Sequence, residues 1–242
     1  MEAAPKAVPA YIFTQIPDTA AAEAFAFFQS VASTDPHMMP RSEGEIQEFA
    51  NSGELFGVRN AESGALVAMA YATLEERKRE WEFGGLIVGN DVQNLGIGTT
   101  LTGFVLCSLI ANERPWYRGD TVITHVHEDN PDPRNLLNGW GFQPIDGPEG
   151  KTVLKGEMAP PSMKRNAEGN VVGDKFGLPR AAVRKLASWI NSEFGGLLRD
   201  GKTRAIFEVR PSGPDSIKEA LKQELAEFER ESQRPERDQE AK

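Results

Sequence analysis

The chain has 242 residues, and its 39% of hydrophobic residues is enough to form a substantial core. Its single cysteine, Cys107, excludes an internal disulfide and a zinc site built from several cysteines, so a reducing, cytoplasmic location is expected. The apolar run Leu101–Ile110 is too short and mixed to cross a membrane, and the N-terminal residues lack the charged and apolar regions of a secretory signal.

The net charge of −9 is distributed unevenly along the chain. Residues 1–157 hold 11 Lys and Arg against 22 Asp and Glu, whereas residues 158–242 hold 16 against 14. Because nucleic acids are polyanions, the acidic first part argues against nucleic-acid binding there. It is compatible with a cationic acceptor such as an amine.

Alternating and helical hydrophobic patterns predict the elements of the first part of the chain. Ser42 followed by Glu45 is a capping-box pattern that opens a helix. In chain order, the predicted elements are a strand at Tyr11–Ile16, helices at Ala20–Ala32 and from Ser42 to Asn51, a hairpin of Leu55–Arg59 and Ala65–Thr73, a strand at Trp81–Val88, a helix at Gly96–Asn112, a strand at Thr121–His127, a helix at Pro131–Gly139, and a last hairpin of Phe142–Ile145 and Thr152–Gly156. This order predicts an α/β fold whose mixed, mostly antiparallel central sheet has helices on both faces.

The character of the sequence changes after Glu157, so we expect one domain at 1–157 and a C-terminal α/β extension at 158–242. The extension is predicted to contain a polar linker, a helix, a strand, a helix and a disordered tail, at Ala159–Gly177, Pro179–Phe194, Thr203–Val209, Asp215–Glu231 and Ser232–Lys242. The last helix carries an apolar stripe, and residues 179–231 are therefore a candidate surface for a protein partner or for self-association.

A glycine-rich turn, Gln93-Asn94-Leu95-Gly96-Ile97-Gly98, lies between a predicted strand and a predicted helix. Glycines let the backbone approach an anion closely, and the unpaired N–H groups of a helix start are suited to a pyrophosphate. A P-loop is excluded because no Lys follows Gly98, and a dinucleotide-binding turn is disfavoured because Leu101 replaces its third glycine. A strand-to-helix turn without a ligand is the alternative.

Two gapped motifs around this turn resemble those of the GNAT N-acetyltransferase superfamily. Val88, a gap of four residues and then Gln93–Gly98 match its motif A, and four residues match its motif B: Asn130, Leu136, Gly141 and Phe142. The resemblance covers about Tyr11–Glu157. It implies the GNAT fold, acetyl-CoA as the cosubstrate without a metal, and transfer of an acetyl group to an amine of a small molecule or a protein.

The resemblance also implies which residues hold the cofactor. The strand backbone would bind the pantetheine arm, the turn and the helix start would bind the pyrophosphate, and an asparagine would contact the arm or support the opening beside it. These positions are Leu86, Ile87, Val88, Gln93, Asn94, Leu95, Gly96, Ile97, Gly98, Thr99 and Asn130. Adjacent glycines, Gly84 and Gly85, predict a β-bulge in the same strand.

Acetyl transfer from a thioester requires a base for the amine and a donor for the developing negative charge. Glu82, six residues before Val88, is the first candidate for the base, and His127 is the second. A solvent-exposed glutamate and a structural histidine are the alternatives. Leu137 stands where many family members carry a tyrosine that acts as the general acid. This departure favours the alternative function of a catalytically inactive CoA-binding regulatory or interaction protein.

Two further groups of residues bear on the site. His125, His127 and Asp129 resemble a metal motif of another fold, but the next residue is Asn130 and the chain has only one other histidine, so no metal is predicted. The loop His37–Arg41 and the following helix are expected to shape the acceptor site, with Met38, Met39, Glu43, Glu45 and Glu48 as candidates or, for the acids, as a solvated helix face.

Overall fold

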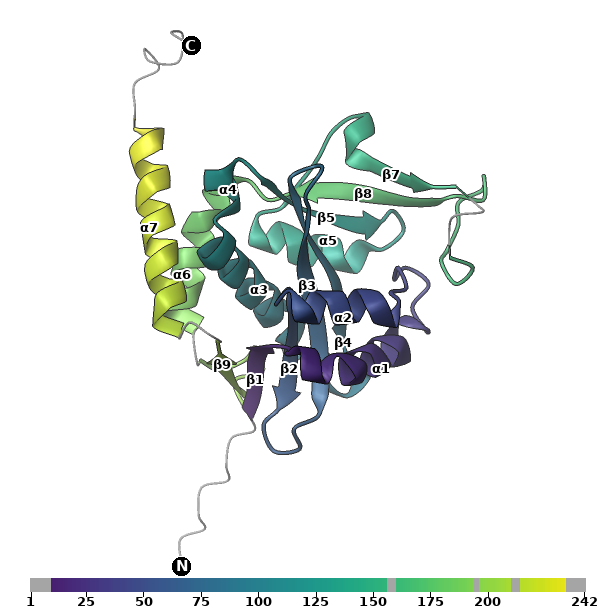
Figure 1. Cartoon of the computed structure of the whole chain (residues 1–242), viewed down its shortest axis with the longest axis horizontal. Helices are drawn as coiled ribbons and strands as arrows, with labels where there is room; N and C mark the ends of the chain where they lie inside the picture. The colour runs from purple at the N-terminus through teal and green to yellow at the C-terminus, as the bar shows by residue number, and fades with distance from the viewer. Residues whose placement is uncertain (1–9, 156–159, 194–195, 210–213, 234–242) are drawn as a thin grey trace, which may run out of the picture.

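One mixed sheet runs through the residues that the computed structural model describes, which are 10–155, 160–193, 196–209 and 214–233 (Figure 1). Its strands are β1 (Ala10–Gln15), β2 (Leu55–Asn60), β3 (Leu66–Glu75), β4 (Glu80–Val88), β5 (Thr121–His127), β6 (Gln143–Pro144), β7 (Lys151–Leu154), β8 (Val171–Gly177) and β9 (Arg204–Glu208). Their order across the sheet is β6-β8-β5-β4-β3-β2-β1-β9, and β7 also pairs with β8. The pairs β4·β5 and β1·β9 are parallel and the other pairs are antiparallel.

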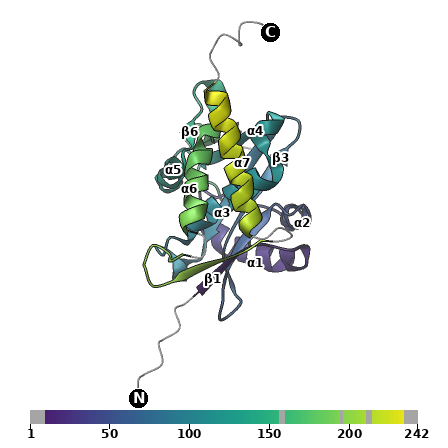
Figure 2. The same cartoon turned by 90° about the vertical axis from the view of Figure 1, so that its left-hand side faces the viewer.

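Helices cover both faces of this sheet, as predicted (Figures 1 and 2). The helices are α1 (Ala21–Ala32), α2 (Glu43–Asn51), α3 (Ile97–Glu113), α4 (Pro115–Arg118), α5 (Pro131–Trp140), α6 (Val183–Glu193) and α7 (Pro214–Ser232), with short 3₁₀ turns η1 (Asp18–Ala20), η2 (Asn90–Val92), η3 (Pro148–Gly150) and η4 (Arg180–Ala182). One face packs on α1 and α2, and the other packs on α3, behind which α6 and α7 lie side by side. Within the described residues, no helix is long and apolar enough to span a membrane.

The burial of α3 explains its composition. Every residue from Leu101 to Ile110 is buried, so the helix has no solvent-facing stripe. The sheet covers one side of α3, and α6 and α7 cover the other with side chains that are themselves buried: Val183, Leu186, Ile190, Ile217 and Leu221. The apolar stripe of α7 therefore packs on the core of this chain.

Two predictions about residues 142–177 were wrong. Val171–Gly177 is strand β8 and not part of a linker, and the two predicted hairpin strands pair with β8 instead of with each other. The hydrophobic pattern of β8 is weak because Gly173 and Gly177 interrupt it and because it contains two charged residues. Those charges have partners: Asp174 contacts Lys151 and Arg134, and Lys175 contacts Glu80.

The predicted boundary after residue 157 separates elements that share one sheet. Strand β8 pairs with β5 inside one end of the sheet, with Thr124 opposite Phe176, and β9 pairs with β1 at the other end, with Phe13 opposite Phe207. The short helix α4 was not predicted. The tail predicted for Ser232–Lys242 lies outside the described residues from position 234 onward.

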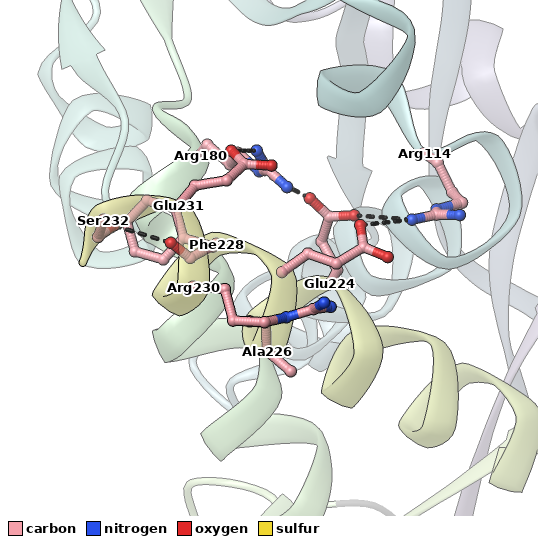
Figure 3. A network of polar contacts seen from close by, with 9 residues as sticks. Arg114, Arg180, Glu224, Ala226, Phe228, Arg230, Glu231 and Ser232 are labelled. Atoms are coloured by element: carbon pink, nitrogen blue, oxygen red, sulfur yellow. Dashed lines mark hydrogen bonds and ion pairs between the residues drawn. The ribbon is translucent and has the colours of Figure 1, made fainter. Parts of the chain in front are cut away.

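A network of ion pairs fastens α7 to the rest of the molecule (Figure 3). Glu224 is only 2% exposed and lies between two guanidinium groups, 2.8 Å from Nε of Arg180 and 3.7 Å from Arg114. Each arginine has a second carboxylate partner on α7, Glu231 for Arg180 and Glu227 for Arg114. A buried carboxylate held by two cations is costly to replace, because its removal leaves the cations without their shared partner.

We expect Glu224→Ala to lower the free energy of unfolding by about 2 kcal/mol or more, since it breaks a buried ionic network. The measurement is urea unfolding followed by circular dichroism. Glu229→Ala is the control, because Glu229 forms an exposed pair with Arg184 at 3.9 Å and such pairs contribute about 0.5 kcal/mol or less. Equal effects of the two variants would contradict a structural role for the network.

Candidate active site

A gap opens where β4 and β5 separate. The two strands pair over only three positions, ending with Glu82 opposite Ile123. Beyond that point β4 continues along β3, while β5 continues along β8. A cavity of about 370 Å³ lies in the gap, and residues of both strands line it. The splitting of a parallel pair thus creates a pocket in the middle of the sheet.

The predicted β-bulge lies at the wall of this cavity and is confirmed. The register between β3 and β4 shifts between Met69, opposite Ile87, and Tyr71, opposite Gly84. Gly85 has a φ of +58°, which a residue with a side chain rarely adopts. The Tyr71 ring occupies the space beside both glycines, since a Cβ atom built on Gly84 would lie 2.5 Å from its Oη.

The predicted phosphate turn follows β4 directly. After η2, Asn94 and Gly96 adopt left-handed conformations with φ of 66° and 89°, and α3 begins at Ile97. A Cβ atom on Gly98 would lie 3.4 Å from a methyl group of Val88, so the first turn of α3 packs closely on the end of β4. Backbone N–H groups at such a helix start are suited to a pyrophosphate.

The predicted cofactor residues fall in two adjacent places. Leu86 and Asn130 line the cavity, whereas the side chains of Ile87 and Ile97 are buried in the core, so these two offer only backbone groups. The remaining positions form the end of β4, the turn and the first residues of α3: Val88, Gln93, Asn94, Leu95, Gly96, Gly98 and Thr99. The structure therefore places all of these positions except Asn130 along β4, its following turn and the start of α3, and Asn130 lies at the start of α5 on the same cavity.

A loop of the C-terminal part packs against the phosphate turn, which the sequence did not indicate. The backbone N–H of Arg199 donates to the carbonyl of Leu95 at 3.1 Å. A Cβ atom on Gly96 would lie 2.8 Å from Cβ of Arg199, so a side chain at position 96 would displace this loop. The absence of a side chain at Gly96 thus serves the packing of the turn as well as its backbone conformation.

Charged groups gather around Glu82 on the cavity wall. Oε1 of Glu82 lies 3.8 Å from Arg41, and Oε2 lies 3.9 Å from Nδ1 of His125. Burial acts to raise the pKa of Glu82, but His125, Arg41 and Lys78 together outweigh it and lower the pKa below 4.5. The carboxylate therefore stays ionised at neutral pH inside a partly enclosed site.

Tyr71 lies beside this cluster and is almost completely buried. Its hydroxyl oxygen accepts a hydrogen bond from Arg41, and its ring stacks on Phe49 with the centroids 4.6 Å apart. Burial and the charge of Glu82 raise the pKa of Tyr71 to about 12, although Arg41 opposes them. Tyr71 is thus a phenol that keeps its hydrogen at physiological pH.

His127 also lines the cavity, but both of its ring nitrogens are engaged. Nδ1 accepts from the backbone N–H of Asp129 at 3.2 Å, so Nε2 donates to the carbonyl of Lys164 at 2.9 Å. The ring of His37 meets it edge-on at 5.0 Å. The three histidines of the chain therefore line one cavity, and His127 is the one held by backbone groups on both sides.

Methionines surround another part of the cavity. Met38 and Met39 line it, and Met163 reaches it from the segment after residue 160 and packs with Met39, Leu154 and Val171. The predicted acids of this region differ in their positions. Glu45 pairs with Arg41 at 3.0 Å and closes the capping box with Ser42, whereas Glu43 and Glu48 are exposed on α2 and do not line the cavity.

Several residues of the cavity were not singled out by the sequence. Tyr71 lies within an apolar strand pattern, and Thr152, Met163 and Val171 come from segments assigned to the last hairpin and the linker. Leu137, at the place of the usual tyrosine, is buried at the cavity and cannot donate a hydrogen. Among the described residues, no three His, Cys, Asp or Glu side chains group to hold a metal ion.

Comparison with known proteins shows which solved structures share this architecture. No protein-family model and no curated protein matches the sequence. The structure is similar to an acetyltransferase of the GNAT family from Streptococcus pneumoniae, with a TM-score of 0.50, 17% identity and coverage of 69% of this chain and 98% of that chain. It is also similar to a chain of the NatC complex bound to Gag peptide and CoA, with a TM-score of 0.50, 15% identity and coverage of 70% and 98%.

These similarities confirm the fold that the two motifs predicted. The chain has the GNAT fold, with a mixed, mostly antiparallel sheet that opens between two parallel strands. A fold shared at such low identity does not define the reaction, which depends on the residues of the cavity.

Proposed function

We propose that the protein is an acetyl-CoA-dependent N-acetyltransferase of the cytoplasm that acetylates an amine of a small molecule or a protein. The observation that carries this proposal is the continuity of one site. The phosphate turn, the part of β4 that does not pair with β5 and the charged cluster around Glu82 follow one another along a single strand and its turn.

The direction of the cofactor follows from this order. A pyrophosphate on the backbone of Leu95–Thr99 places the pantetheine arm at the end of β4, and the arm then runs back along Leu86–Val88. Because β5 no longer pairs with this stretch, no described strand occupies that edge of β4, and its backbone groups can bond the arm. The thioester accordingly reaches the bulge at Gly84–Gly85, and Asn130 borders the arm.

The charged cluster supplies the chemistry for the acceptor. An amine reacts only after its ammonium form loses a proton. The carboxylate of Glu82 attracts the ammonium group, and the proton passes to the pair formed by Glu82 and His125. Nε2 of His125 forms no hydrogen bond with any described residue. After this first proton has passed to solvent, the neutral amine attacks the thioester carbonyl carbon, the nitrogen gives a second proton to the same pair, and CoA leaves as the thiolate. His127, with both nitrogens engaged, instead positions the segment that contains Lys164.

The test is release of free CoA thiol from acetyl-CoA in the presence of a panel of amines and peptides. We expect Glu82→Gln to lower kcat/KM by about 100-fold or more while the dissociation constant for CoA is unchanged, because the amide cannot accept the proton. Glu48→Gln, an exposed acid of α2, is the control and should match the wild type. A Glu82→Gln variant with wild-type turnover would contradict the assignment.

The lowered pKa of Glu82 determines how its contribution to stability changes with pH. Because the pKa is lowered in the folded protein, the stabilisation by the ionised carboxylate is fully present above the unfolded value of 4.5. It is lost as the pH falls through the lower folded value. The difference in unfolding free energy between the wild type and Glu82→Gln should therefore shrink below pH 4.5.

The alternative function is a catalytically inactive CoA-binding regulatory or interaction protein. Leu137 favours it, because the usual donor is missing at this position. Measurable CoA binding together with no thiol release for any acceptor would support this alternative over the enzyme.

A further inference from the structure

The cavity offers a hydrogen donor for the leaving sulfur at an unexpected place. When the amine nitrogen bonds to the thioester carbon, the carbon–sulfur bond breaks and its electron pair moves to sulfur. A donor beside the sulfur stabilises this charge. On α5, the side chain of Leu137 has no hydrogen to give, and it is buried. Any donor to the sulfur therefore lies on another element of the site.

The hydroxyl of Tyr71 lies at the point that the thioester reaches. On the proposed function, the arm runs back along β4 and ends at Gly84–Gly85. Oη of Tyr71 is so close to Gly84 that a Cβ atom there would lie 2.5 Å from it, and a Cβ on Gly85 would lie 2.4 Å from the ring. The bulge and the two missing side chains thus bring the phenol to the wall that the thioester meets.

Among the described residues, none accepts the hydrogen of the Tyr71 hydroxyl. Arg41 donates to Oη, so the oxygen is used as an acceptor and its O–H remains to be donated. The charged groups that face the phenol are Arg41 in the loop before α2, Glu45 in the first turn of α2 and Glu82 on β4. The stacking of the ring on Phe49 fixes its direction.

We propose that Tyr71 donates a hydrogen bond to the thioester sulfur as the bond to the acetyl carbon breaks, taking the place of the missing donor on α5. The sulfur leaves as a thiolate held by the O–H of Tyr71, with Arg41 behind the phenol. The amine proton goes to the Glu82–His125 pair and then to solvent, and the thiolate takes a proton from solvent as CoA departs. This inference rests on the proposed function.

Titration of bound CoA tests the proposal without requiring turnover. The thiolate of CoA absorbs in the ultraviolet where the thiol does not, so the pKa of the bound thiol can be measured directly. A donor that stabilises the thiolate lowers this pKa, and Tyr71→Phe should raise it by about one unit or more relative to the wild type. Tyr71→Phe retains the ring that packs on Phe49, so CoA affinity and the thermal midpoint should be preserved.

The same variant gives a kinetic readout. We expect Tyr71→Phe to lower kcat by about 100-fold with little change in KM, as for loss of a donor that acts in the transition state. Tyr117→Phe, which makes the same change at an exposed tyrosine of α4 that does not line the cavity, is the matched control and should change neither kcat nor the titration.

The outcomes separate this inference from the function on which it rests. An active wild type whose Tyr71→Phe variant keeps both kcat and the pKa of bound CoA overturns the role of Tyr71 and leaves the function intact. An inactive wild type that binds CoA rules out the enzymatic function, yet the titration of its bound thiol still supports or overturns the contact with Tyr71. A wild type that does not bind CoA overturns both.

Discussion

A protein that ends at residue 157 is expected to be insoluble or unfolded. The truncation removes β8, which pairs with β5, β6 and β7, and it removes the helices that cover α3. Five of the lost side chains on α6 and α7 are completely buried aliphatic groups, each worth about 1.5–3 kcal/mol. Because a domain is stable by only about 5–15 kcal/mol, this loss exceeds what the remaining part can tolerate.

The measurement is the soluble fraction on expression, followed by the thermal unfolding curve of any soluble protein. A chain that ends at residue 233 is the control, because residues 234–242 contain no large apolar side chain and their removal should leave the curve unchanged. A soluble 1–157 fragment with a cooperative transition would show that residues 158–242 are a separable unit, free to recruit a partner.

Replacement of Gly85 by alanine is expected to damage both stability and activity. An alanine at φ of +58° is strained by about 1–2 kcal/mol, and its Cβ atom would lie 2.4 Å from the Tyr71 ring. The ring must then move away from the wall that we assign to the thioester. Since a displacement of about 1 Å in a reacting site can cost about 100-fold in rate, we expect a comparable fall in kcat.

Gly64→Ala isolates the backbone part of this effect. Gly64, in the turn between β2 and β3, has a φ of +72° with no atom near its would-be Cβ, so it should lose stability without loss of kcat. In the double variant Gly85→Ala, Tyr71→Ala the clash is absent, so the loss of unfolding free energy should be smaller than the sum of the single losses. Additive losses would contradict the proposed steric conflict.

The elements that the sequence predicted well have strong local signals. Ser42 and Glu45 cap α2 as expected, and the strand containing Gly84 and Gly85 has the predicted bulge. The phosphate turn was also predictable, because its glycines and its position between a strand and a helix are both local features. Such features depend on residues close together in the chain, and they are read directly from the sequence.

The rest depended on contacts between distant residues. Strand β8 was missed because its Asp174 and Lys175 resemble a solvated loop until their partners on other elements are known. Tyr71 looked like an ordinary strand residue, and its meeting with Arg41 and Gly84 follows only from the folded register. For the same reason, spacing alone gave no indication that backbone groups occupy both nitrogens of His127.

The parallel pair β1·β9 also bears on how this molecule is made. Strand β1 is the first of the described strands to be synthesised, but its outer neighbour, Arg204–Glu208, is synthesised only after all the others. Until then one edge of β1 has no partner, and an unpaired edge is prone to associate with other chains. Forming a contact between strands so far apart in the sequence also slows folding. We therefore expect this protein to complete its sheet late in folding and to refold slowly.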